Sequence, residues 1–235
     1  MAGSSGHRFA VAIIFLLGAA SLACLALLGF RMWYSQSVHY WFLAWNLALA
    51  WLPFMFAGIA YALAATRRTV AYVAVVVSAL MWLLFFPNAP YILTDFLHLG
   101  SMGDIVPGWF DVLMLFWFAL AGLMLGVVSL YLMQDIVSRA LGSTAGWVFV
   151  VLAAGLGSLG IYLGRFLRWN SWDLLRRPGP LAGELVGRIT DPGNQPRLLG
   201  FTVGFALLFL FIYVAVYIFA KLAHKAGPQA DGRSG

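Results

Sequence analysis

Charged side chains are scarce in this sequence. Only 9% of its 235 residues are charged, whereas 63% are hydrophobic. Soluble domains carry roughly 25% charged residues, because a soluble fold must cover its exterior with groups that water solvates. Fourteen basic and eight acidic side chains are too few for that purpose in a chain of this length. The composition therefore excludes an ordinary soluble protein and indicates that lipid surrounds much of the chain.

Cysteine is almost absent as well. The single cysteine, Cys24, lies inside an apolar run, which excludes an intramolecular disulfide. The net charge is +6, but the basic residues flank apolar runs, where they set membrane orientation and meet anionic headgroups. We therefore expect no nucleic-acid partner, and we expect membrane lipids as the surroundings.

The apolar runs are continuous and about twenty residues long, the length of a membrane-spanning helix. The strands of a membrane β-barrel would instead alternate between apolar and polar residues. The sequence thus predicts an all-α, polytopic transmembrane bundle with a short interfacial helix after the third span. Residues 1–235 form one integral membrane domain in this prediction, with a disordered tail at 222–235. The predicted spans are 9–30, 41–65, 69–86, 110–132, 146–167 and 199–220.

Six spans place both termini on one side of the membrane and the connections 31–40, 87–109 and 166–198 on the other. Basic residues are balanced, with seven on each side. If Arg165 and Arg168 serve a site rather than orientation, the balance favours cytoplasmic termini. We therefore expect a multi-pass protein of the bacterial cytoplasmic membrane with its termini inside. Most acidic residues lie on the opposite side, and these are Asp95, Asp104, Asp111, Asp173, Glu184 and Asp191. That side is where we expect the functional site.

The first informative motif covers residues 86–99, FPNAPYILTDFLHL. Pro87 and Pro90 break the third helix, so a new short helix can begin near Pro90 with Tyr91, Asp95 and His98 on one face. Ionisable groups at membrane depth are costly and mark functional sites, so Asp95 and His98 are the candidate catalytic residues. The alternative is that Asp95 caps a helix while His98 lies among headgroups.

The second motif covers residues 160–175, GIYLGRFLRWNSWDLL. If the fifth helix continues through it, Arg165, Arg168 and Trp172 share a face. Guanidinium groups can bind phosphate or carboxylate through paired donors. The alternative is an aromatic belt with snorkelling arginines. The predicted ligand-binding residues are Arg165, Arg168, Asn170, Asp173, Tyr91 and Asp111, with Asp95 expected close to one of the arginines.

Other patterns are not expected to carry chemistry. Residues 155–160, GLGSLG, match a dinucleotide-binding fingerprint, but no strand precedes them and they lie inside an apolar run. Like the glycine pairs 122/126, 160/164 and 200/204, they are expected to permit close helix packing. His98, Asp95, Asp104 and Asp111 match no metal-ligand spacing, so we expect no metal and no cofactor.

The two motifs, together with Trp109-Phe110-Asp111, resemble a bacterial membrane-protein family known as domain of unknown function 1361. The likeness covers about residues 35 to 220. It implies a multi-pass membrane protein and carries over no catalytic residue.

Three functional hypotheses remain open on the sequence. The first is binding or transport of an anionic lipid or small anion at the polar interfacial site. The second is a membrane-embedded hydrolase or transferase acting on a lipid phosphate, with Asp95 or His98 as general base. The third is a structural helper that packs against a membrane partner. The sequence does not choose between an enzyme and a binding protein, and it does not indicate the oligomeric state.

Overall fold

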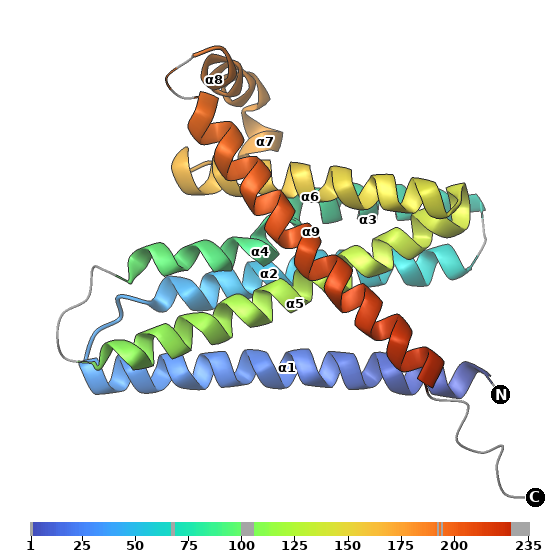
Figure 1. Ribbon diagram of the computed structural model, residues 1–235, viewed down its shortest axis with the longest axis horizontal. Helices are drawn as coiled ribbons and strands as arrows, with labels where there is room; N and C mark the ends of the chain where they lie inside the picture. Colours follow the sequence, from blue (N-terminus) through green and yellow to red (C-terminus); the bar gives the residue numbers. More distant parts are fainter. Residues whose placement is uncertain (1, 67–68, 100–105, 192, 194, 227–235) are drawn as a thin grey trace, which may run out of the picture.

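The computed structural model describes residues 2–66, 69–99, 106–191, 193 and 195–226, and these residues form helices joined by short connections (Figure 1). The elements, in chain order, are α1 (Ala2–Ser35), α2 (Trp41–Ala65), α3 (Thr69–Phe85), α4 (Asn88–Tyr91), the 3₁₀ helix η1 (Ile92–His98), α5 (Gly108–Leu141), α6 (Ser143–Phe166), α7 (Asp173–Arg176), α8 (Pro178–Thr190) and α9 (Gln195–Ala226).

Six helical stretches are long and apolar enough to cross a membrane, which confirms the predicted all-α polytopic bundle. The helices α1, α2 and α6 run in nearly the same direction, α5 is inclined to them, and α9 crosses the bundle obliquely (Figure 1). The helices are longer than the predicted spans at several ends. The helix α9 includes residues 222–226 of the predicted tail, and residues 227–235 lie outside the described part of the chain.

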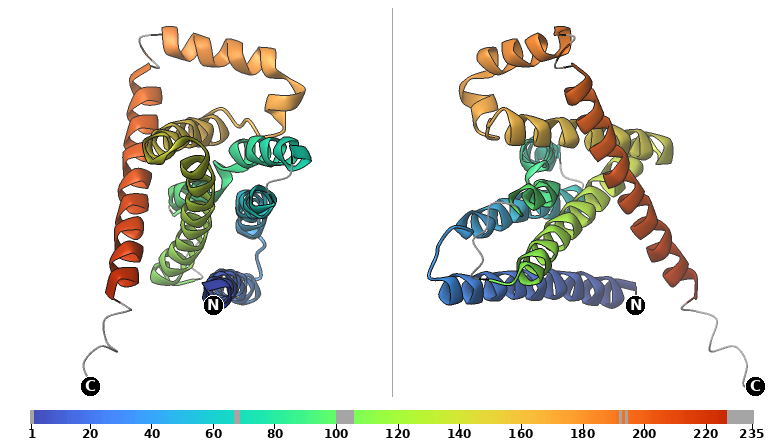
Figure 2. Two further views of the ribbon diagram at one scale, coloured as in Figure 1. Left: turned by 90° about the vertical axis from the view of Figure 1, so that its right-hand side faces the viewer. Right: turned by 60° about the vertical axis from the view of Figure 1, so that its left-hand side comes forward.

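The end of α1, the start of α2, the end of η1, the start of α5 and the end of α6 lie at one end of the bundle, which we call the polar end (Figure 1). The start of α1, the end of α9 and the α5–α6 connection lie at the opposite, terminal end. Figure 2 shows α8 along its length in the view in which α1 is seen end-on. The helix α8 therefore lies across the spans at the polar end, where the sequence predicted no helix.

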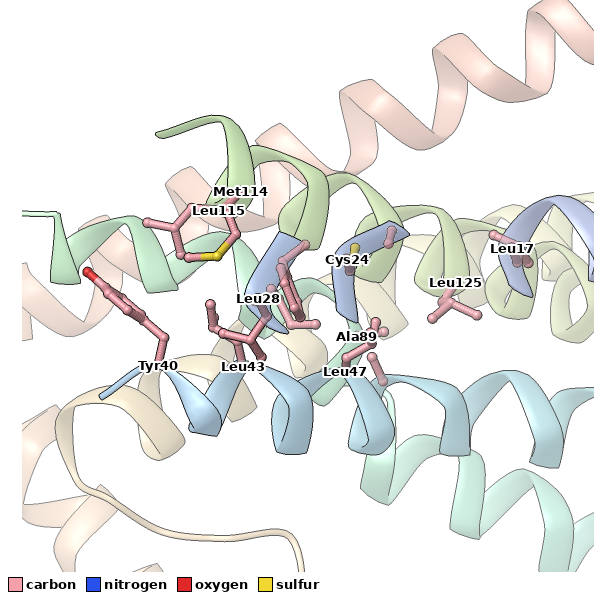
Figure 3. Packing of buried hydrophobic residues seen from close by; sticks show 14 residues of the cluster. Leu17, Cys24, Leu28, Tyr40, Leu43, Leu47, Ala89, Met114, Leu115 and Leu125 are labelled. Carbon is pink, nitrogen blue, oxygen red and sulfur yellow. The ribbon is translucent and has the colours of Figure 1, made fainter. Parts of the chain in front are cut away.

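Two apolar clusters hold the spans together. The first lies between α1, α2 and α5, around the fully buried Cys24, Leu43 and Met114 (Figure 3). The second joins α3, α5, α6 and α9 around Trp82 and Tyr213. Lipid tails are as apolar as these side chains, so close packing rather than exclusion of water stabilises the contacts.

The third span is broken where the two prolines predict it. The helix α3 ends at Phe85, α4 begins at Asn88, and η1 continues as a 3₁₀ helix of seven residues. Runs of 3₁₀ helix longer than three or four residues are uncommon and often mark functional segments. The predicted short helix after the third span is therefore present, in two parts.

Glycines of α5 and α6 make room for this broken segment. A Cβ atom on Gly122 would lie 2.6 Å from the carbonyl oxygen of Ala89, and one on Gly160 would lie 2.5 Å from Cγ of Pro87. Gly157 packs on the Phe86 ring in the same way. These glycines have the packing role that the sequence predicted. The pair Gly200/Gly204 in α9 does not, because a Cβ there would meet no described atom within 4 Å.

Candidate functional site

The carboxylate of Asp95 is the most deeply buried charge at the polar end, with a fully inaccessible side chain. Its Oδ2 accepts a hydrogen bond from Nδ2 of Asn46 in α2, at 2.9 Å. Its Oδ1 lies 3.3 Å from Nη1 of Arg165 in α6, although the angles are not those of a hydrogen bond. Asp95 therefore links the broken third span to α2 and α6.

Arg165 is surrounded by groups from the α4–η1 segment. Its Nη2 donates to the carbonyl oxygen of Thr94, and its Nη1 lies 3.4 Å from Oη of Tyr91 and 3.2 Å from Nε2 of His98. The guanidinium also lies over the Tyr91 ring, 5.4 Å from the ring centre. Because an arginine donates and cannot accept, Nε2 of His98 must accept here, so the proton of the neutral imidazole is on Nδ1.

Tyr91, Asp95 and His98 therefore lie on one side of the broken segment, as predicted, and all three contact Arg165. We call these four residues, with Asn46, the Arg165 cluster. The contact between Asp95 and Arg165 confirms the expected approach of the two motifs. Three of the five N–H donors of the arginine already have partners in the protein.

Asp111 does not join this cluster. It forms a second buried ion pair with Arg31 at the end of α1, in which Nε donates to Oδ1 at 2.8 Å and Nη2 to Oδ2 at 3.3 Å. The Arg31 guanidinium lies 4.2 Å from the centre of the Tyr40 ring. Burial, and secondarily the negative charge of Asp111, raise the pKa of Tyr40. Arg31 was not among the predicted site residues. Its position at the end of an apolar run, on the same side as Asp111, makes it one possible partner, but the choice among arginines depends on which helices pack together.

The helix α6 ends at Phe166 instead of continuing through the second motif. The carbonyl oxygen of Leu163 accepts the N–H groups of Leu167 and Trp169, and Arg168 has a left-handed backbone with φ of 58°. The helical spacing that would put Arg165 and Arg168 on one face therefore ends before Arg168. Its side chain is exposed and makes no hydrogen bond or ion pair with any described residue. The expected shared face of Arg165, Arg168 and Trp172 is therefore wrong, because it required helical geometry across a turn.

The segment after α6 is fixed by local hydrogen bonds. Oδ2 of Asp173 accepts from the backbone N–H of Asn170 at 2.8 Å and from its Nδ2 at 3.3 Å. Ser171 accepts from Nδ2 of Asn88 at 3.2 Å, which joins this segment to α4. The Trp169 indole donates to Glu184 at 2.8 Å and so attaches α8. The predicted ligand residues Asn170 and Asp173 are thus close together, and Asp173 holds the turn.

A cavity of about 570 Å³ lies between α2, α3 and α6 and extends to the polar end. Its volume is within the ordinary range for small-molecule sites, about 300–1,000 Å³. The apolar side chains of the spans that line it are Leu49, Leu80, Met81, Leu83, Leu84, Leu156, Leu159 and Leu163, and Leu181 of α8 lines it at the polar end. The polar and aromatic lining residues are Trp45, Asn46, Asn88, Tyr91, Trp169, Asn170 and Ser171.

The chemistry of the cavity changes with depth. Along α6, Leu156 lies ~12 Å deeper than Gly164 by the helical rise per residue. Along α2, Asn46 precedes Leu49, and that helix runs from the polar end inward (Figure 1). The cavity is therefore polar near the membrane surface and apolar inside.

Of the residues predicted to bind a ligand, Tyr91 and Asn170 line the cavity. The other four, Arg165, Asp111, Arg168 and Asp173, do not line it. Arg165 contacts the hydroxyl group of Tyr91, which does. Four other lining residues, Asn88, Ser171, Trp45 and Trp169, were not among the predicted ligand-binding residues. Asn88, Trp169 and Ser171 lie within the two motifs. Their polar groups, in otherwise apolar sequence, were the feature from which a binding role could have been predicted.

Metal-binding side chains do not come together in the described residues. No group of three or more His, Cys, Asp or Glu residues there could hold an ion. Asp104, one of the residues considered for a metal, lies outside the described part of the chain.

The fold and these residues define a polytopic helical membrane protein with a broken span, buried ion pairs and a cavity that is polar at its outer end. The chain belongs to the family described as "Protein of unknown function (DUF1361)", whose model matches residues 45–224. The match includes both motifs and every residue that lines the cavity. No curated protein and no solved structure matches the chain.

Proposed function

We propose that this protein binds a membrane lipid, with part of an acyl chain against the leucines of the cavity and the headgroup at its polar end. The observation that carries the proposal is the change in lining from Asn88, Asn170 and Ser171 outside to leucines inside. A lipid has the same order of polar and apolar parts along its length. A small anion would leave the leucine-lined space unused.

The residues that the sequence analysis selected as catalytic support binding better than catalysis. Neither Asp95 nor His98 lines the cavity, and both contact Arg165. A general base must come within hydrogen-bonding reach of the proton that it removes. The Arg165 cluster instead holds Asn46 and Tyr91, which do line the cavity. We assign the cluster a positioning role.

The hypothesis of a structural helper needs helix faces that are free to pack against a partner, and the glycines of α5 and α6 do not support it. Those of α5 and α6 that contact the broken span are used inside this chain and are not left for a partner. The location we propose is the bacterial cytoplasmic membrane, with the termini in the cytoplasm. Arg31 and Arg165 are nearly buried and paired with carboxylates, so fewer free positive charges remain at the polar end than the sequence count suggests.

The proposal is tested with a variant in which a larger side chain from α6 occupies part of the cavity. Leu159→Trp adds bulk to a residue that lines it. Leu152→Trp makes the same change two turns earlier, at a residue that is 59% exposed and outside the lining. Lipids that copurify with each detergent-solubilised variant are quantified by mass spectrometry per mole of protein.

We expect Leu159→Trp to lose most of the bound lipid and Leu152→Trp to retain it. Size-exclusion profiles and thermal midpoints establish that both variants fold. Equal lipid retention in the two folded variants would contradict the proposal.

A further inference from the structure

The polar end of the cavity is uncharged. None of its lining residues in the described part of the chain is Asp, Glu, Lys, Arg or His. The nearby charges, Asp95 and Arg165, are paired with each other and lie outside the lining. Arg168, the exposed arginine of the second motif, is also outside it. Ligand recognition in the cavity therefore depends on neutral hydrogen-bonding groups.

Three asparagine side chains contribute to this end, and their amide nitrogens already have protein partners. Nδ2 of Asn46 donates to the Asp95 carboxylate, Nδ2 of Asn88 to the carbonyl oxygen of Phe85, and Nδ2 of Asn170 to the Asp173 carboxylate. These partners can only accept, so they fix which side of each amide faces them.

The amide oxygens of the same three residues are left available. Oδ1 of Asn46, Asn88 and Asn170 accepts no hydrogen bond from a described residue. Asn170 is an exposed residue, and the oxygens of Asn46 and Asn88 are not among the described buried atoms that lack a partner. Three residues that line the cavity therefore each carry an amide oxygen without a partner among the described residues.

Groups that can donate lie beside these acceptors. The hydroxyl of Tyr91 accepts from Arg165, and that of Ser171 accepts from Asn88, so each hydroxyl proton remains for a ligand. The Trp45 indole N–H makes no hydrogen bond to a described residue. A complementary headgroup must both donate and accept, which hydroxyl groups do and phosphate or carboxylate anions do not.

We infer that the headgroup bound in this cavity is an uncharged polyol, such as a glycosyl or glycerol group, rather than an anionic phosphate. The inference rests on the proposed lipid-binding function and names the class of lipid. Hydroxyl donors of a polyol would pair with the three amide oxygens. An anionic headgroup would place its negative oxygens against those same acceptors and leave them unpaired, which is costly in a partly desolvated site.

The experiment compares two lipids with identical acyl chains. Purified protein in an amine-oxide detergent, which has no sugar headgroup to compete, is mixed with equal amounts of glucosyl-dioleoylglycerol and dioleoyl phosphatidic acid. Native mass spectrometry measures how much of each lipid is retained. The variants are wild type, Leu159→Trp, Asn170→Ala and, as a control at an exposed polar residue outside the lining, Gln195→Ala.

We expect wild type to retain the glucosyl lipid about tenfold better than phosphatidic acid, the ratio that corresponds to about 1.4 kcal/mol. Asn170→Ala should reduce retention of the glucosyl lipid several-fold and leave phosphatidic acid unchanged, and Gln195→Ala should change neither. Methyl glucoside in excess should not displace the lipid, because it leaves the leucine-lined part empty. Displacement would overturn a lipid as the ligand in favour of a free sugar.

Two outcomes separate this inference from the proposed function. Suppose that wild type retains phosphatidic acid to the same extent as the glucosyl lipid, and that Leu159→Trp abolishes the retention of phosphatidic acid. The protein then binds lipid in the cavity, and the inferred preference for an uncharged headgroup is wrong. If Leu159→Trp leaves the retention of both lipids unchanged, cavity binding fails, and the inference fails with it.

Discussion

At the scale of single residues, two buried ion pairs dominate the polar end. Arg31 pairs with Asp111 and Arg165 with Asp95, and each pair joins helices that are distant in sequence. Breaking such a pair costs about 3–5 kcal/mol, since the remaining charge stays buried without compensation. Replacing both members by apolar residues is far less costly. The pairs therefore fix which helices are neighbours more than they add net stability.

Arg165→Met is expected to lower the thermal midpoint of the detergent-solubilised protein strongly, because it leaves the Asp95 carboxylate buried beside Asn46 alone. The double variant Arg165→Met/Asp95→Leu should recover much of the loss. Midpoints are measured by the heat-dependent loss of the monodisperse peak in size exclusion.

Arg168→Met is the matched control, since Arg168 is exposed and has no partner in the described residues. It should change the midpoint little. If Arg168→Met is as destabilising as Arg165→Met, the distinction between the two arginines is wrong.

At the scale of helices, the broken third span determines how α5 and α6 approach each other. The segment from Phe86 to Tyr91 lies against α5 glycines on one side and α6 glycines on the other. Close backbone approach of this kind is the usual role of small residues in membrane helices. The Asn88 and Tyr91 side chains reach the cavity because this segment is held so closely.

Gly160→Ala and Gly200→Ala make the same change at two helix positions with opposite surroundings. At Gly160 the new methyl group would lie 2.5 Å from Cγ of Pro87, whereas at Gly200 it would meet no described atom within 4 Å. Overpacking costs about 1–3 kcal/mol, so Gly160→Ala should lower the thermal midpoint and Gly200→Ala should not.

The same midpoint for both alanine variants would show that the broken segment can move away from α6. It would then remove the argument that the glycines position Asn88 and Tyr91. Lipid retention measured on the same samples separates a loss of stability from a loss of the cavity.

At the scale of the whole molecule, six spans put the polar end on one side of the membrane and both terminal helix ends on the other. For a labelling test, Cys24→Ala removes the native thiol, and single cysteines are placed at Arg168 and at Ser143, which begins α6 at the terminal end. A membrane-impermeant maleimide should label position 168 in intact bacterial cells, and position 143 only after permeabilisation.

The reverse labelling pattern would invert the proposed orientation and leave the fold unchanged. Labelling of both positions from the same side would contradict the six-span arrangement itself.

The spans were predictable from the sequence because the length and composition of an apolar run determine whether it can cross a bilayer. The break at Pro87 was predictable for an equally local reason. The approach of Asp95 to one of the two arginines was predictable because an unpaired charge near the hydrocarbon is costly. The helix α8 was not, because its short, glycine-rich sequence (Pro178–Thr190) carries little helical signal. The pairing of Arg31 with Asp111 also could not be predicted, since it depends on which helices pack together.

The two members of each buried ion pair are synthesised at different times. Arg31 is made before Asp111, and Asp95 is made 70 residues before Arg165. Because synthesis adds about 5–20 residues per second, Arg165 is made roughly 4 to 14 seconds after Asp95. Asn46, which donates to Asp95 in the complete fold, is already synthesised during that interval. A chain that ends after α5 would therefore contain both members of the Arg31–Asp111 pair, whereas Asp95 would lack the arginine that pairs with it in the complete fold.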